Sequence, residues 1–189
     1  MAPRTVHIAI ISKHDTCTIT FCASLLKLQV HLARSQDVQA SINFYPCETD
    51  ALKDFADKQH ETLVMVHSHI GVPETFFLED PAYDFVVSPY PLAKIDWDRV
   101  SRKLADATTT EAPEHVGNVY NFDPETGVPV SPRYFKVPRE AVAEFGVCKL
   151  RRGVSFEDVE YVYVDLTQPS VNHGTMAYTG CVGVRRHLR

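Results

Sequence analysis

Short apolar runs alternate with amphipathic stretches through the first half of the chain. Val6–Ile11 is a β-branched run that predicts a buried strand, and the stretch that follows it to Arg34, capped by Asp15 or Thr16, predicts a helix. Residues 38–45 alternate between apolar and polar side chains, which predicts a second strand. Residues 48–59 predict a second helix, and Leu63–Val66 is a fully apolar third strand.

The second half of the chain is less regular. Pro73 begins a predicted short helix that ends at Leu78, because proline is favoured in the first turn of a helix. Residues 108–132 are rich in Thr, Pro, Gly and Asn and predict a loop or a β excursion. The remaining predicted elements are a strand at 84–88, a helix at 95–104 capped by Asp96, a strand at 135–137, a helix at 139–145 ended by Gly146, and a strand at 161–166.

This order of elements predicts an α/β fold. Strands and helices alternate through the first 105 residues, which is typical of a mostly parallel, twisted central sheet with helices on both faces. The length of 189 residues suits a single domain, 1–189. Ligands of such sheets bind beyond the carboxyl ends of the strands. Polar side chains follow two predicted strands there, at Ser12–Asp15 and at His67–His69, and these are the first candidates for function.

Composition and charge narrow the class of protein. The formal charge of −5 and the pI of about 6.0 do not indicate a nucleic-acid partner. The five cysteines are odd in number and form no CxxC pair, so we expect reduced thiols in a reducing compartment. No apolar run reaches the length of about 18 residues that a membrane span needs. The prediction is therefore a soluble cytoplasmic protein; the oligomeric state stays open.

Two histidines two positions apart are the main candidates for chemistry. His67 and His69 follow the third predicted strand, where side chains at i and i+2 point to the same side and can converge on one ion. Two surface histidines on a turn are the alternative, and a third ligand such as His173 is needed to decide between them. The chain has no GxSxG, GK[ST], HExxH or GxGxxG motif, so common hydrolase, phosphate-loop and dinucleotide sites are not indicated.

Several segments, taken in order, resemble the type A nucleotide-sugar glycosyltransferases. In that family an apolar strand ends in Asp-x-Asp and is followed by a "φ-x-Pro" turn and a short helix. Leu63–Pro73 (LVMVHSHIGVP) has the same order of apolar strand, polar triplet and turn, with His-Ser-His as the triplet. The similarity is greatest to the small single-domain members from large DNA viruses and phages. The other matching segments are Tyr83–Pro91 (YDFVVSPYP), Lys94–Trp97 (KIDW), Tyr161–Asp165 (YVYVD), Val171–Gly174 (VNHG) and Tyr178–Gly180 (YTG).

The resemblance implies a donor site for a nucleoside diphosphate sugar at the strand ends, with an acceptor that it does not identify. It implies that a divalent metal held at the Asp-x-Asp places neutralises the leaving diphosphate. By position, His67 and His69 occupy the two aspartate places, and His173 occupies the place of a C-terminal metal-binding histidine. The donor-binding residues that it implies are Ile10, Ser12, His14, Asp15, His67 and Ser68, and the residues near the place of the family's acid or base are Glu157 and Asp158.

One departure from the family pattern changes the expected metal. Two neutral imidazoles stand where the family has two carboxylates, so Mn²⁺ or Zn²⁺ is expected in preference to Mg²⁺, or no metal at all. Three hypotheses follow. The chain is an active glycosyltransferase that uses His-Ser-His in place of Asp-x-Asp, a catalytically inactive binding module with the same fold, or a small metal-dependent hydrolase that activates water with its histidines.

Overall fold

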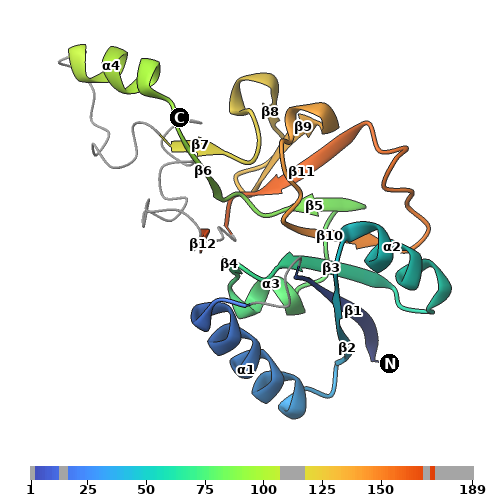
Figure 1. Cartoon of the computed structure of the whole chain (residues 1–189). Coiled ribbons are helices and arrows are strands. Elements are labelled where there is room, and N and C mark those ends of the chain that lie inside the picture. The colour runs from blue at the N-terminus through green and yellow to red at the C-terminus, as the bar shows by residue number, and fades with distance from the viewer. Residues whose placement is uncertain (1–2, 13–16, 107–117, 168–170, 173–189) are drawn as a thin grey trace.

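The structure is a computed structural model that describes residues 3–12, 17–106, 118–167 and 171–172 (Figure 1). Its centre is an eight-stranded sheet with the strand order β2-β1-β3-β10-β5-β11-β9-β8. An α/β fold is therefore confirmed. The strands of the sheet are β1 (Arg4–Ile11), β2 (Val38–Tyr45), β3 (Thr62–His67), β5 (Phe85–Val87), β8 (Val128–Pro129), β9 (Tyr134–Pro138), β10 (Val147–Arg151) and β11 (Tyr161–Asp165).

The sheet is mixed, so the prediction of a mostly parallel sheet is wrong. The pairs β1–β2, β1–β3 and β5–β11 are parallel, whereas β10 runs antiparallel to both β3 and β5, and β9 runs antiparallel to β11 and β8. Strands and helices do alternate along the first 105 residues, but the late strand β10 lies between β3 and β5 in the sheet. The sequence pattern did not predict β10 because Lys149 interrupts its apolar run, although that side chain is only 3% exposed.

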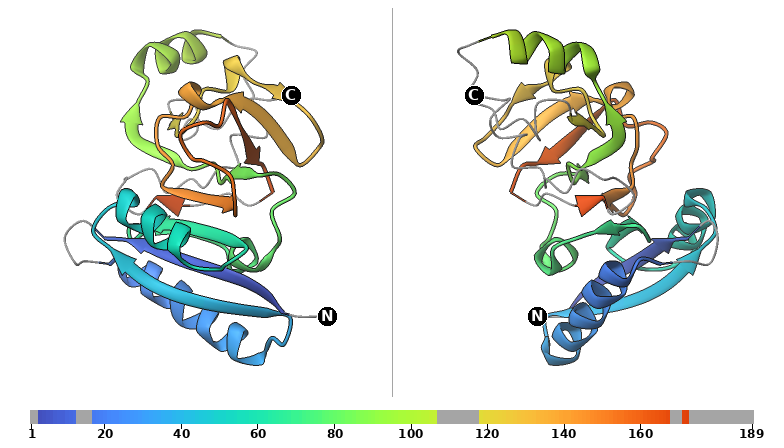
Figure 2. Two further views of the ribbon diagram at one scale, coloured as in Figure 1. Left: turned by 90° about the vertical axis from the view of Figure 1, so that its right-hand side faces the viewer. Right: turned by 60° about the vertical axis from the view of Figure 1, so that its left-hand side comes forward.

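Four helices accompany the sheet in the described residues, and two of them enclose its parallel half. Chain order places β2 and β3 on opposite sides of β1, so right-handed crossovers put the two connecting helices on opposite faces. Figure 2 shows α1 and α2 on the two sides of β1–β3. The helices are α1 (Ile19–Arg34), α2 (Glu48–Asp57), α3 (Glu74–Leu78) and α4 (Trp97–Ala105), with 3₁₀ turns at η1 (Pro124–Thr126) and η2 (Arg139–Ala141).

Most predicted elements of the first half lie within a few residues of the observed ones. β2 matches its predicted range, and Asp96 caps α4 by accepting a hydrogen bond from the backbone N–H of Arg99. The helix predicted over 139–145 is wrong, because only the single turn η2 forms. Val142 pairs with Phe122 in an isolated bridge, and the N–H of Ala143 donates to the carbonyl of Asn121, so backbone groups that a helix needs are used elsewhere.

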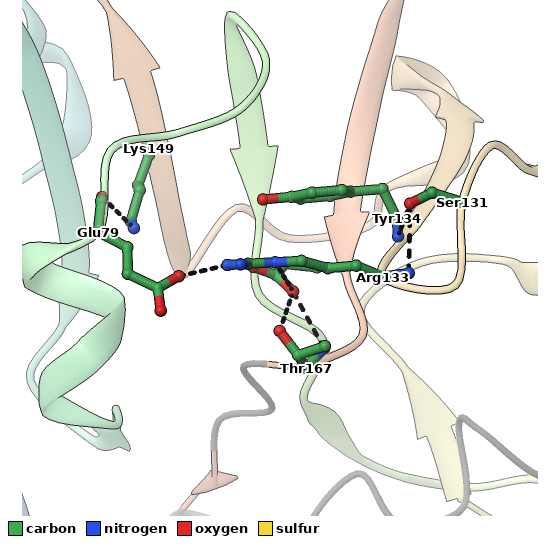
Figure 3. A network of polar contacts seen from close by, with 7 residues as sticks. Glu79, Ser131, Arg133, Tyr134, Lys149 and Thr167 are labelled. Atoms are coloured by element: carbon green, nitrogen blue, oxygen red, sulfur yellow. Dashed lines mark hydrogen bonds and ion pairs between the residues drawn. The ribbon is translucent and has the colours of Figure 1, made fainter.

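Two small sheets complete the fold, and a polar network links the end of α3 to β11. β4 (Ile70–Gly71) pairs with β12 (Val171–Asn172), and β6 (Pro91–Ile95) pairs with β7 (Asn118–Tyr120). Figure 3 shows Arg133 directed at Glu79, which directly follows α3. Arg133 also pairs with the buried carboxylate of Asp165 on β11, 2.7 Å from Nη2. No described helix is long and apolar enough to cross a membrane.

Candidate functional site

The candidate site lies where the direction of chain winding reverses, between the carboxyl ends of β1 and β3. Ile11 and His67, the last residues of these strands, are paired in register. The chain then turns through Ser68, whose N–H donates to the carbonyl of Ile11 at 2.9 Å and whose carbonyl accepts from the N–H of Thr18 at 3.2 Å. Such a switch point is the usual ligand crevice of an open α/β sheet.

A cavity of about 690 Å³ opens at this point, within the range of about 300–1,000 Å³ that small-molecule sites occupy. Its walls come from the strand ends, from the N-terminal ends of α1 and α2, and from the segments before and after β10. The lining residues are Ile11, Cys17, Thr18, Glu48, His67, Ser68, His69, Ala143, Glu144, Phe145 and Phe156. Imidazoles, carboxylates and aromatic rings therefore face one space.

His67 is in hydrogen-bonding contact with Glu48. Its Nε2 lies 2.8 Å from Glu48 Oε1, and the imidazole is 13% exposed. β3 presents His67 on the face that α2 covers, and Glu48 is the first residue of α2, so the two elements bring the side chains together. Because an ionised carboxylate only accepts hydrogen bonds, Nε2 carries a proton and donates a hydrogen bond to Glu48. A carboxylate that orients a histidine is the arrangement of a general base or of a metal-binding histidine.

His69 also lies at the cavity, in the turn between β3 and β4. Its ring centroid is 5.7 Å from that of His67, so the two imidazoles lie close together, whereas their convergence on one ion stays a prediction. In the part of the chain that the structure describes, no group of three or more His, Cys, Asp or Glu side chains is arranged to hold a metal ion. His173, the predicted third ligand, lies outside the described residues. The described residues alone therefore do not fit a complete metal site.

The N-terminus of α1 gives the cavity a partial positive charge. Thr18 caps this 16-residue helix, accepting a hydrogen bond from the N–H of Phe21 at 3.2 Å, and the first turn contains no acidic residue. Aligned peptide dipoles and first-turn N–H groups make such an end suited to anions. Cys17 lies beside it, and partial burial together with the neighbouring Cys22 raises the pKa of its thiol, which disfavours the nucleophilic thiolate.

The opposite wall is formed by residues on either side of β10. Phe145 and Phe156 meet edge to face with their centroids 5.1 Å apart, and both line the cavity. The Tyr90 hydroxyl donates to Glu144 at 3.3 Å and accepts from the N–H of Gly146 at 3.1 Å, and burial raises the pKa of this tyrosine. The wall is therefore held by a buried phenol that stays protonated.

The predicted donor-binding and catalytic residues are distributed unevenly around this cavity. His67, Ser68 and His69 line it. Ile10 is fully buried in the core, and its neighbour Ile11 is the lining residue. Ser12 is buried and its N–H donates to the carbonyl of Tyr45. His14 and Asp15 lie outside the described residues, and Glu157 and Asp158 are exposed in the turn that follows Phe156.

The sequence prediction missed Glu48 and Glu144. Glu48 could have been found by the rule that already selected His67, because it follows the carboxyl end of β2 and opens the next helix. Glu144 carries no such signal, since it lies in irregular chain that reaches the cavity only through the antiparallel insertion of β10.

Comparisons with protein-family models, with curated proteins and with solved structures find no match to this chain.

Proposed function

We propose that the chain is a glycosyltransferase that moves a sugar from a nucleoside diphosphate sugar to an acceptor, and that the cavity between β1 and β3 holds the donor. The observation that carries the proposal is the convergence of the α1 N-terminus with His67 and His69 at the switch point of the sheet. The resemblance of the sequence to type A nucleotide-sugar glycosyltransferases supports the same site.

In this proposal the diphosphate lies at the N-terminus of α1. First-turn N–H groups donate to the phosphate oxygens, and the helix dipole favours their negative charge. Phe145 and Phe156 offer aromatic faces and edges on which a nucleobase can stack. The two carboxylates of the cavity, Glu48 and Glu144, disfavour an anion, so the phosphate is expected on the side of Thr18 rather than beside them.

His67 is assigned the role of general base. In a direct displacement the acceptor oxygen bonds to the sugar carbon while the bond from that carbon to the diphosphate oxygen breaks. The acceptor proton passes to Nδ1 of His67, and Glu48 stabilises the imidazolium through Nε2–H. The diphosphate leaves with the electron pair of the broken bond. Mn²⁺, expected in preference to Mg²⁺, stays a proposal, and no step depends on it because the described ligands are incomplete.

Isothermal titration with UDP and with GDP, each with and without Mn²⁺, tests the donor site. We expect one of the two nucleotides to bind, and His67→Ala to weaken that binding by about tenfold, since it leaves the carboxylate of Glu48 without its imidazole partner beside the anion. His31→Ala, on the exposed side of α1, is the matched control and should bind as the parent does. Binding of neither nucleotide under any metal condition would contradict the proposal.

A metal-dependent or metal-free hydrolase is the second candidate, and the His67–Glu48 contact is the observation that favours it. The sequence alone placed no carboxylate beside the histidines, whereas the fold supplies one at 2.8 Å that can help His67 to activate water. Incubation with nucleotide sugars in the absence of any acceptor separates the two. Release of free sugar that is as fast without an acceptor as with one favours a hydrolase. Turnover that requires an added acceptor favours a transferase.

A further inference from the structure

The solvent-facing side of α1 carries a continuous apolar seam. Ile19, Leu26 and Val30 are 89%, 63% and 52% exposed, and Ala23 and Ala33 between and beyond them are exposed as well. We call these five residues the outer seam. On a helix that already packs against a sheet, five exposed apolar residues in one line are unusual.

The opposite side of α1 is already occupied by its own apolar stripe. Phe21 and Leu28 are fully buried, and Leu25 and Leu32 pack against the same core. The helix is thus apolar on two faces, whereas a helix with one free face normally places polar side chains there. The outer seam is not needed for the packing of this domain.

The spacing of the outer seam identifies the kind of surface that it fits. Its residues follow each other at intervals of four, three, four and three positions, which is the a/d repeat of helices that pack along each other. A two-in-seven stripe is narrower than the apolar face of a helix that lies in a membrane surface. The small side chains of Ala23 and Ala33 also allow a neighbouring helix to approach closely.

The positive charges beside the outer seam indicate the charge that a partner should carry. Lys27, His31 and Arg34 border Leu26 and Val30 around a hollow of about 380 Å³, and α1 contains no acidic residue. His31 and Arg34 complement the dipole at the helix C-terminus, but Lys27 lies in the middle of the helix, where the dipole does not account for it. Among the described residues, no ion pair engages Lys27 or Arg34.

We propose that the outer seam of α1 is a docking surface for an amphipathic helix of a partner protein with acidic residues flanking its apolar stripe. In an antiparallel pair of α1 helices, Lys27 and Arg34 of one copy would face the same cations of the other, which disfavours a second copy as the occupant. An acidic partner helix places opposite charges there instead.

The surface begins at the mouth of the cavity. Ile19, the first residue of the outer seam, directly follows Thr18, which caps α1 and lines the cavity. A helix docked along α1 therefore ends beside the candidate site. The docking surface does not depend on the proposed chemistry of that site.

Titration of the full chain with synthetic helical peptides tests the proposal. The probe is a peptide of three heptads with Leu at its a and d positions and Glu at its flanking positions, and the control probe has Lys in place of each Glu. We expect the Glu peptide to bind at least about tenfold more tightly than the Lys peptide, with an affinity that falls as salt is added.

Three variants of the chain sharpen the result. Leu26→Gln combined with Val30→Gln should weaken binding of the Glu peptide by about tenfold or more, because each substitution removes apolar area from the contact. Leu104→Gln on α4, where the parent leucine is 64% exposed, is the matched control and should change nothing. Lys27→Glu combined with Arg34→Glu should reverse the preference between the two peptides. Circular dichroism checks that all three remain folded.

The outcomes that overturn the proposal are separate from one another. Equal binding of both peptides, or binding of neither, removes the acidic helix as partner. A dimer in sedimentation that Leu26→Gln combined with Val30→Gln abolishes identifies a second copy of the chain as the occupant. Sedimentation with vesicles of phosphatidylcholine and phosphatidylserine, lost in the same variant, identifies a membrane surface. All of these results are independent of whether UDP or GDP binds in the cavity.

Discussion

Nε2 of His67 at the end of β3 lies 2.8 Å from Oε1 of Glu48 at the start of α2. The contact joins the two sides of the candidate site, because β3 ends on the cavity floor and α2 begins on its wall. It also sets which nitrogen of the imidazole is protonated, and this is the property on which the proposed chemistry depends.

The first prediction concerns the tautomer of His67. Long-range ¹⁵N NMR of the neutral imidazole should show the proton on Nε2. Glu48→Gln should keep that tautomer, because the amide oxygen can still accept the hydrogen bond, whereas Glu48→Ala should remove the preference. Glu144→Ala, which changes the other carboxylate of the cavity, should leave the spectrum of His67 unaltered. An Nδ1–H tautomer in the parent protein would contradict the assignment.

The second prediction concerns the close contact at Gly146. A Cβ at this position would lie 2.5 Å from the Tyr90 hydroxyl oxygen and 2.7 Å from Ile70 Cδ1, so both neighbours must move. The carbonyl of Gly146 also accepts from the N–H of His67 at 2.8 Å. Gly146→Ala should therefore lower the free energy of unfolding by about 1–3 kcal/mol and shift the amide resonance of His67. An unchanged urea midpoint together with an unchanged His67 resonance would show that the wall is looser than the contacts indicate.

The third prediction is a loss of stability in acid that originates at His7. This imidazole is fully buried on β1, where Nδ1 contacts the Ser41 hydroxyl and Nε2 contacts the Tyr45 hydroxyl, each at 2.7 Å. Burial, with the neighbouring Lys58 and His60, lowers its pKa from 6.5 to about 4. The unfolded chain therefore takes up this proton at higher pH than the folded protein does, so stability is full above pH 6.5 and falls as the pH drops towards 4.

The expected loss for His7 is on the order of 2–3 kcal/mol across that interval. Urea unfolding at steps between pH 7.5 and 4 measures it. His7→Gln should be less stable at neutral pH and should show a shallower decline between pH 6.5 and 4. A decline equally steep in His7→Gln would assign the acid sensitivity to other groups, such as His60, whose pKa is also lowered by burial.

The fourth prediction concerns Arg133 in the network of Figure 3. Its guanidinium donates through Nε and Nη2 to Asp165, a carboxylate that is 2% exposed and also accepts from Thr167. Arg133→Met should lower the free energy of unfolding by about 3 kcal/mol, since it leaves a buried carboxylate without its cation. Arg133→Met combined with Asp165→Asn should recover part of the loss. Arg152→Met, at an exposed position, should change the free energy of unfolding little. An equal loss of stability in Arg152→Met would contradict a specific role for the Arg133–Asp165 pair.

The first three strands and their helices could be predicted because local pattern and final position agree there. Val6–Ile11 is apolar except for His7, because β1 lies between β2 and β3 and all six of these residues are buried. β10 could not be predicted in the same way. Its position depends on contacts with strands that are distant in the sequence. A lysine such as Lys149 normally indicates a surface position, but here it is buried and its Nζ donates a hydrogen bond to the carbonyl of Glu79 at 2.8 Å.

The candidate site was predictable where it depends on strand ends and not where it depends on irregular chain. His67 to His69 follow β3 directly, so the rule for α/β sheets selects them. Phe145 and Phe156 reach the cavity from segments on either side of β10. No periodicity marks these residues, and their role follows only from the antiparallel insertion that the sequence did not reveal.

A crystal structure of the chain soaked with UDP and, separately, with GDP tests the central claim most directly. We expect electron density for the diphosphate at the N-terminus of α1, beside Thr18 and His67, with the base towards Phe145 and Phe156. Density at a different place on the molecule, or a cavity that stays free of nucleotide at saturating concentration, would contradict a donor site between β1 and β3.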